Sequence, residues 1–144
     1  MSSSAEKSIV LAVLMALCLG TAFAADANST KSMVTITNAS FKAPSPENDN
    51  LIGEWVEIAN EGSVLRSLQG WTLSNQHNRT YAFNNFTLAA GAFVKVHTGI
   101  GNDTATDLFW NRKMAVWNND GDLATLKDAV ENVVSIYPRE PVKA

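Results

Sequence analysis

Short apolar runs alternate with polar clusters along most of the chain. Val, Ile, Phe, Trp and Thr dominate the runs, whereas Gly, Asn, Asp, Ser and Pro dominate the clusters between them. This arrangement is typical of β-strands joined by turns, and no window keeps the 3.6-residue period of a helix. The pattern predicts strands at residues 34–37, 54–58, 70–73, 81–83, 92–97, 123–126 and 133–137.

Two of the predicted strands also show which side faces the core. Val56 and Ile58 fall on one face of the second strand, and Val94 and Val96 share one face of the fifth. Residues 43–50 contain two prolines in a polar run and predict a loop. About seven to nine short strands in a chain of this size predict an all-β, immunoglobulin-like β-sandwich. We expect Trp71 to pack between its sheets.

The first 24 residues have the pattern of a secretory signal peptide. Lys7 precedes an uninterrupted apolar run at residues 9–20, and Ala22-Phe23-Ala24 supplies the small-x-small site of a signal peptidase. The run is too short for an ordinary membrane span. We therefore expect cleavage after Ala24, secretion, and a single domain at residues 25–144. An uncleaved anchor is the alternative, although no basic cluster follows the run.

Composition narrows the classes of partner and modification. The chain has 11 Lys and Arg against 14 Asp and Glu, a net charge of -3, which gives no general attraction to nucleic acid. The single cysteine, Cys18, lies in the predicted signal, so the secreted domain would rely on packing rather than a disulfide. Of five Asn-x-Ser/Thr sequons, the ones predicted to be most accessible to glycosylation are Asn28, Asn78 and Asn102.

Residues suited to catalysis are scarce. His77 and His97 lack the spacing of zinc ligands, and no cysteine accompanies them. Glu54 and Glu57 lie three apart in a strand and point to opposite faces, so they cannot form a carboxylate pair. No nucleophile elbow or phosphate-binding glycine loop is present in the sequence. We expect no catalytic residue, no cofactor and no enzymatic activity.

Residues 118–122, Asn-Asn-Asp-Gly-Asp, permit two interpretations. Alternate oxygen side chains around a glycine can wrap a calcium ion, which makes Asp120 and Asp122 candidate metal ligands. The segment lacks the distal glutamate and the flanking helices of an EF-hand. A polar turn with Asp120-Gly121 at its tip is therefore favoured, and we expect no bound metal.

A second cluster combines aromatic and basic residues in the long connection before residue 123. Loops on a rigid scaffold commonly carry binding. Aromatic rings beside positive charges suit the stacking of nucleobases, and exposed rings also suit sugars. Packing of both tryptophans into the core is the favoured interpretation, and a surface platform for a ligand is the alternative. The candidate binding residues are Trp110, Arg112, Lys113 and Trp117.

Several segments resemble the lamin tail domain family in content and in order. They are IGEWVEIAN at 52–60, LQGWTL at 68–73, residues 81–91, VHTG at 96–99, TDLFW at 106–110 and AVWNNDGD at 115–122. The chain resembles the secreted prokaryotic-type members of that family. The resemblance implies an immunoglobulin-like sandwich, and it implies association with hydrolases or nucleases in some members.

Two functions follow from these observations. The first is a secreted, non-catalytic binding or cell-surface interaction module whose partner is an extracellular protein or glycan. The alternative is an extracellular nucleic-acid-binding accessory domain, centred on residues 110–117. The scattered basic residues and the negative net charge oppose the alternative.

Overall fold

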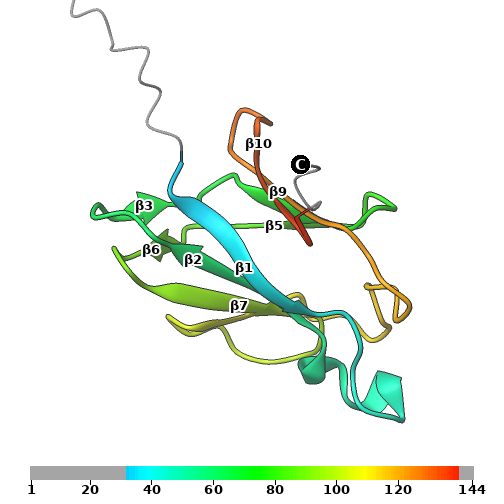
Figure 1. Cartoon of the computed structure of the whole chain (residues 1–144). Helices are drawn as coiled ribbons and strands as arrows, with labels where there is room; N and C mark the ends of the chain where they lie inside the picture. The colour runs from blue at the N-terminus through cyan, green and yellow to red at the C-terminus, as the bar shows by residue number, and fades with distance from the viewer. Residues whose placement is uncertain (1–31, 140–144) are drawn as a thin grey trace, which may run out of the picture. The chain divides into compact units, whose positions relative to one another are not determined.

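A computed structural model describes residues 32–139 (Figure 1). The described part contains ten β-strands, two three-residue 3-10 helices and no α-helix. Among these residues no helix has the length and hydropathy needed to cross a membrane. The predicted signal peptide, residues 1–24, and the candidate glycosylation site Asn28 lie outside the described residues.

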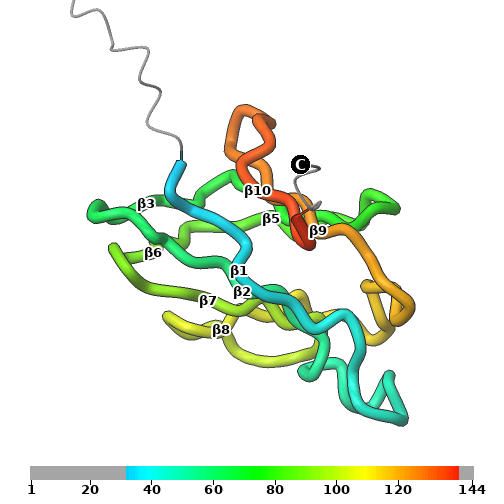
Figure 2. The backbone as a smooth tube through the Cα atoms, in the orientation of Figure 1, coloured from blue at the N-terminus to red at the C-terminus, as the bar shows by residue number. Residues whose placement is uncertain are grey.

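Two four-stranded sheets form the body of the fold (Figures 1 and 2). The first has the order β1 (Val34–Ser40), β2 (Trp55–Asn60), β7 (Phe93–His97), β8 (Asp107–Phe109). The second has the order β10 (Val133–Tyr137), β9 (Ala124–Lys127), β4 (Thr72–Ser74), β5 (Thr80–Ala82). A ribbon of β3 (Arg66–Ser67) and β6 (Thr87–Leu88) completes the strands. Neighbouring strands are antiparallel, except that β7 and β8 are parallel.

The core forms where the inward faces of the two sheets meet. Val56 pairs with Val96 across β2 and β7, and both side chains are buried. In the second sheet Leu73 of β4 pairs with Leu126 of β9, and both are 0% exposed. The predicted period-two alternation therefore places apolar side chains inside, and the all-β, immunoglobulin-like sandwich is confirmed.

The seven predicted strands are all present, with bounds shifted by one to three residues at several ends. The predicted loop at 43–50 is also confirmed, and it contains the 3-10 helix η1 (Glu47–Asp49). Three strands were not predicted: β3, β6 and β8, each of two or three residues. Strands this short contain too few residues for an alternating pattern to be recognised in the sequence. The described residues therefore contain ten strands, more than the predicted seven to nine.

Two long connections come together at one end of the sandwich. The β1–β2 connection contains η1 and η2 (Leu51–Gly53), and the β8–β9 connection runs from residue 110 to residue 123. Figure 2 shows the second connection passing from the first sheet to the second. The loop at residues 61–65 lies at the opposite end, on the left of Figure 1.

Candidate functional site

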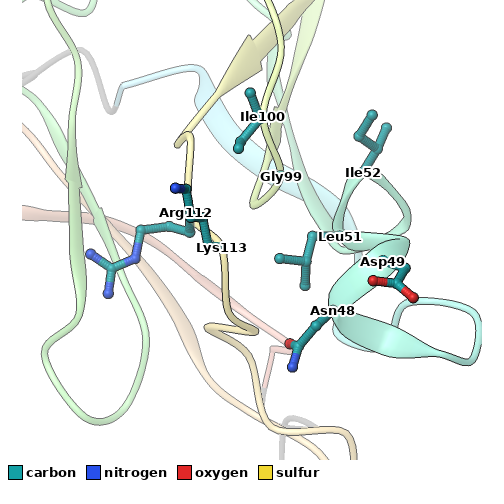
Figure 3. A pocket seen from close by; sticks show the side chains of 8 residues that line it. All are labelled: Asn48, Asp49, Leu51, Ile52, Gly99, Ile100, Arg112 and Lys113. Atoms are coloured by element: carbon teal, nitrogen blue, oxygen red, sulfur yellow. The ribbon is translucent and has the colours of Figure 1, made fainter.

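A cleft of about 300 Å³ lies where these connections meet the end of β7 (Figure 3). One side comes from η1 and η2, and the other from the residues after β7 and after β8. Its lining residues are Asn48, Asp49, Leu51, Ile52, Gly99, Ile100, Arg112 and Lys113.

Gly99 forms the point at which the three segments join. Its N–H donates to the Leu51 carbonyl at 3.2 Å, and its own carbonyl accepts from the Asn111 N–H at 3.1 Å. A Cβ atom at this position would lie 2.9 Å from the Ile52 nitrogen and 3.0 Å from the Leu51 carbonyl carbon. A larger residue would therefore push the walls apart, so the shape of the cleft depends on glycine here.

Exposed apolar and charged side chains surround this junction. Ile52 is 54% exposed and Ile100 is 59% exposed. Arg112 and Lys113 are also exposed, and neither forms an ion pair within residues 32–139. Figure 3 shows the Arg112 guanidinium pointing away from the other lining residues, and Asp49 lies on the other side of the cleft. The cleft thus combines an aliphatic surface with charges of opposite sign on its two sides.

Glu54 anchors the connection that carries the basic pair. Its side chain is fully buried, and its two carboxylate oxygens accept hydrogen bonds from the Val116 and Trp117 N–H groups, each at 3.1 Å. Burial raises the pKa of Glu54, although the nearby Thr98 hydroxyl and the hydrogen bonds from the two amides oppose this rise. Sequence reasoning considered this residue only as half of a carboxylate pair with Glu57. It missed the anchor, because Val116 and Trp117 are distant in sequence.

His97 ties the end of β7 to the same cleft. Its Nδ1 lies 2.8 Å from the Ile52 carbonyl oxygen, and its Nε2 lies 2.8 Å from Oδ1 of Asp107 on β8. The imidazole also stacks on Phe109, with ring centroids 5.0 Å apart. The hydrogen bond from His97 lowers the pKa of Asp107, with help from the Thr106 hydroxyl. These contacts make His97 a positioning residue at a strand end, where the sequence had placed it.

The candidate tryptophans do not form a surface platform. Trp117 is 4% exposed and stacks on Phe41 at a centroid distance of 5.0 Å. Trp110 is half-buried and meets Tyr81 and Trp117 edge to face. The burial of Trp117 agrees with the favoured interpretation of core packing and contradicts the alternative in which its ring stacks on a ligand. Trp71 packs against the core but is only half-buried, so Trp117 is the more deeply buried of the two.

Asp122, one of the two candidate metal ligands, stabilises a turn. The Asp122 carboxylate accepts hydrogen bonds from the backbone N–H groups of Gln76, Asn118 and Leu123, at 3.1, 3.0 and 2.7 Å. Asp120 is exposed at the tip of that turn. Residues 32–139 contain no group of three or more His, Cys, Asp or Glu side chains that could hold a metal ion.

The remaining candidates lie at the surface. Asn78 and Asn102 are both exposed, in the β4–β5 turn and in the β7–β8 connection. Of the four candidate binding residues, the structure brings Arg112 and Lys113 into the cleft and leaves Trp110 and Trp117 out of its lining. Sequence reasoning missed Ile52 and Ile100, which had no distinguishing local pattern.

Two packed β-sheets with long connections at one end define an immunoglobulin-like β-sandwich domain. The family model for the Lamin Tail Domain matches residues 25–140, which is most of the chain. The chain therefore belongs to the lamin tail domain family. A comparison with curated proteins gave no match.

Proposed function

We propose that this protein is a secreted, non-catalytic interaction module that binds an extracellular protein at the cleft. The observation that carries this proposal is the exposure of Ile52 and Ile100 beside Arg112 and Lys113, which form no ion pair with any other residue of the described range 32–139. Exposed aliphatic side chains that border a concave surface with a few polar groups are typical of ligand sites. Membership of the lamin tail domain family supports an interaction module.

The rigidity of the cleft supports the same proposal. The Arg112 N–H donates to the Thr98 carbonyl at 2.9 Å, directly beside the junction at Gly99. Glu54 fixes the far end of the same connection through two backbone amides. A surface that is already ordered loses less conformational entropy when a partner binds. The cleft is therefore suited to recognition without rearrangement.

Nucleic-acid binding is the second candidate, and the basic pair is its only support. Stacking of bases needs exposed aromatic rings, whereas Trp117 is buried and Trp110 is half-buried. Two cations on a chain of net charge -3 contribute only a small, salt-dependent attraction. We therefore rank a protein partner above nucleic acid.

The proposal predicts that one substitution in the cleft abolishes capture of a partner. The purified protein and its Ile100→Asp variant would be immobilised and exposed to the extracellular fraction of the host. Val64→Asp is the matched control, because Val64 is 62% exposed and lies in the loop at the other end of the sandwich. We expect wild type and control to retain the same partner, identified by mass spectrometry, and Ile100→Asp to lose it.

Two results would contradict this proposal. Equal retention of the partner by Ile100→Asp and wild type would place the binding surface elsewhere on the domain. Retention that nuclease or glycosidase treatment removes would assign the partner to nucleic acid or glycan. Matched melting curves for the two aspartate variants would show that a loss of binding is not a loss of folding.

Secretion is a separate part of the proposal and rests on the apolar run at 9–20 and the site Ala22-Phe23-Ala24. We expect N-terminal sequencing of the exported protein to begin at Ala25. Recovery of the chain from membranes with Met1 or Ser2 at its amino terminus would instead indicate a retained anchor.

A further inference from the structure

We infer that the cleft selects a peptide segment in which an aliphatic side chain has a carboxylate on one side and a hydrogen-bond donor on the other. This inference rests on the proposed function and adds the chemistry of the ligand to it. Three features of the cleft carry it: the kind of apolar surface, the separation of charge between its two sides, and its size.

The apolar surface of the cleft is entirely aliphatic. Ile52 and Ile100 border it, Leu51 lies beneath with 5% exposure, and none of the eight lining residues is aromatic. Sugars and nucleobases are generally held by stacking on aromatic rings, whereas branched aliphatic side chains pack well against one another. A leucine, isoleucine or valine of a partner therefore suits the space between the two isoleucines.

The charges of the cleft are divided between its sides. Arg112 and Lys113 come from the β8–β9 connection, and Asp49 comes from η1 (Figure 3). Within residues 32–139 the only ion pair joins His97 to Asp107, so these three charges are not paired with one another. In Figure 3 the guanidinium of Arg112 points away from the other lining residues, but this exposed side chain can turn toward a ligand carboxylate, for which its planar group is suited, and Asp49 accepts hydrogen bonds. The separation favours a ligand with matching polarity and a fixed orientation.

The size of the cleft limits the ligand to a short contact. Its volume of about 300 Å³ lies at the lower end of the range for ligand clefts, roughly 300–1,000 Å³. Asn48 lies at its edge, where the side-chain oxygen accepts from the Ala115 N–H at 3.4 Å. An extended peptide segment suits these dimensions, because a few consecutive side chains can supply the acid, the aliphatic group and the donor.

A displayed library of random twelve-residue peptides, selected on the purified protein, tests this inference. We expect the retained sequences to place Asp or Glu near Leu, Ile or Val. A synthetic peptide from the selection should bind roughly tenfold more weakly to the double variant Arg112→Glu/Lys113→Glu, because like charges then face each other. It should also bind more weakly to Asp49→Lys and to Ile100→Asp, and with unchanged affinity to Val64→Asp.

The outcomes separate the ligand chemistry from the proposed function. Selected peptides that need Ile100 but lack acidic residues, and that ignore the charge reversal, would overturn the ligand class and leave the cleft as the binding site. Selected peptides that bind Ile100→Asp as well as wild type, or a selection that retains none, would overturn both. A selection on Arg112→Glu/Lys113→Glu that enriches Lys or Arg instead of acids would support the assigned polarity directly.

Discussion

Replacing Glu54 with alanine is expected to lower the free energy of unfolding by about 3 kcal/mol. The side chain is fully buried, and it is the acceptor for the N–H groups of both Val116 and Trp117. A buried amide that loses its partner costs about 1–3 kcal/mol, and relief from burying the carboxylate offsets part of the sum of two such losses. Urea unfolding at neutral pH measures the change.

Glu54→Gln is the intermediate case. The glutamine oxygen can accept from one of the two amides, but its NH₂ group faces the other donor. We therefore expect its loss of stability to lie between wild type and Glu54→Ala. A Glu54→Ala variant as stable as wild type would show that the two hydrogen bonds contribute nothing to the fold. Glu57→Ala, at a partly exposed position in the adjoining strand β2, is the control and should change stability little.

The difference in stability between wild type and Glu54→Gln is expected to depend on pH, and its direction follows from the pKa of Glu54. Burial raises the pKa of Glu54 above its ordinary value of 4.5, so the folded chain binds this proton more tightly than the unfolded chain. The proton-linked part of the Glu54 contribution to stability is then fully present below 4.5 and is lost as the pH rises through its folded pKa, whereas the two amide hydrogen bonds still contribute at neutral pH. The gap in unfolding free energy between wild type and Glu54→Gln should narrow over that window. A gap that widens would mean that the hydrogen bonds, not burial, dominate the pKa.

The sequence predicts a strand well where its residues alternate between the core and the solvent-facing side of the sheet. β2 has the pattern half-buried, buried, half-buried, buried, and its apolar Val56 and Ile58 made this face visible in the sequence. β8 has only three residues, of which Leu108 alone is buried, and it runs parallel to β7 after a loop of nine residues, 98–106. Its existence depends on a partner strand, so local pattern could not reveal it.

The lining of the cleft, too, could be predicted only where the local sequence carried a signal. Arg112 and Lys113 were found because adjacent charges form a local signal, and they do line the cleft. Ile52 and Ile100 have no such signal, since an isoleucine beside a glycine is equally compatible with the core. Only the junction at Gly99, held by hydrogen bonds between segments distant in sequence, brings the two side chains to one surface.

Tryptophan burial was the least predictable feature. Trp71 lies beside a strand and Trp117 lies in a long connection, and a position in a loop usually suggests exposure. The connection instead folds inward because Glu54 binds the Trp117 backbone N–H, which directs the indole toward Phe41. The determinant is a buried polar anchor, and nothing in the local sequence around Trp117 discloses it.

Trp117→Ala is expected to destabilise the protein far more than Trp110→Ala. Truncation of a buried aromatic side chain costs about 3–5 kcal/mol, through lost apolar burial and the cavity that remains. Trp117 is 4% exposed and loses its stacking contact with Phe41, whereas Trp110 is half-buried and already contacts solvent. For a domain of this size the expected fall in melting temperature for Trp117→Ala is on the order of 15 °C.

Thermal unfolding of the two variants and of Trp71→Ala, followed by circular dichroism, measures which of the three substitutions lowers the melting temperature most. Alanine at 117 keeps the backbone N–H that donates to Glu54, so the change reports on the indole and not on the anchor. We expect Trp71→Ala to resemble Trp110→Ala, because both rings are half-buried against the core. A loss at position 110 or 71 equal to the loss at 117 would contradict the burial of the Trp117 side chain. It would also restore that ring as a candidate contact for a ligand.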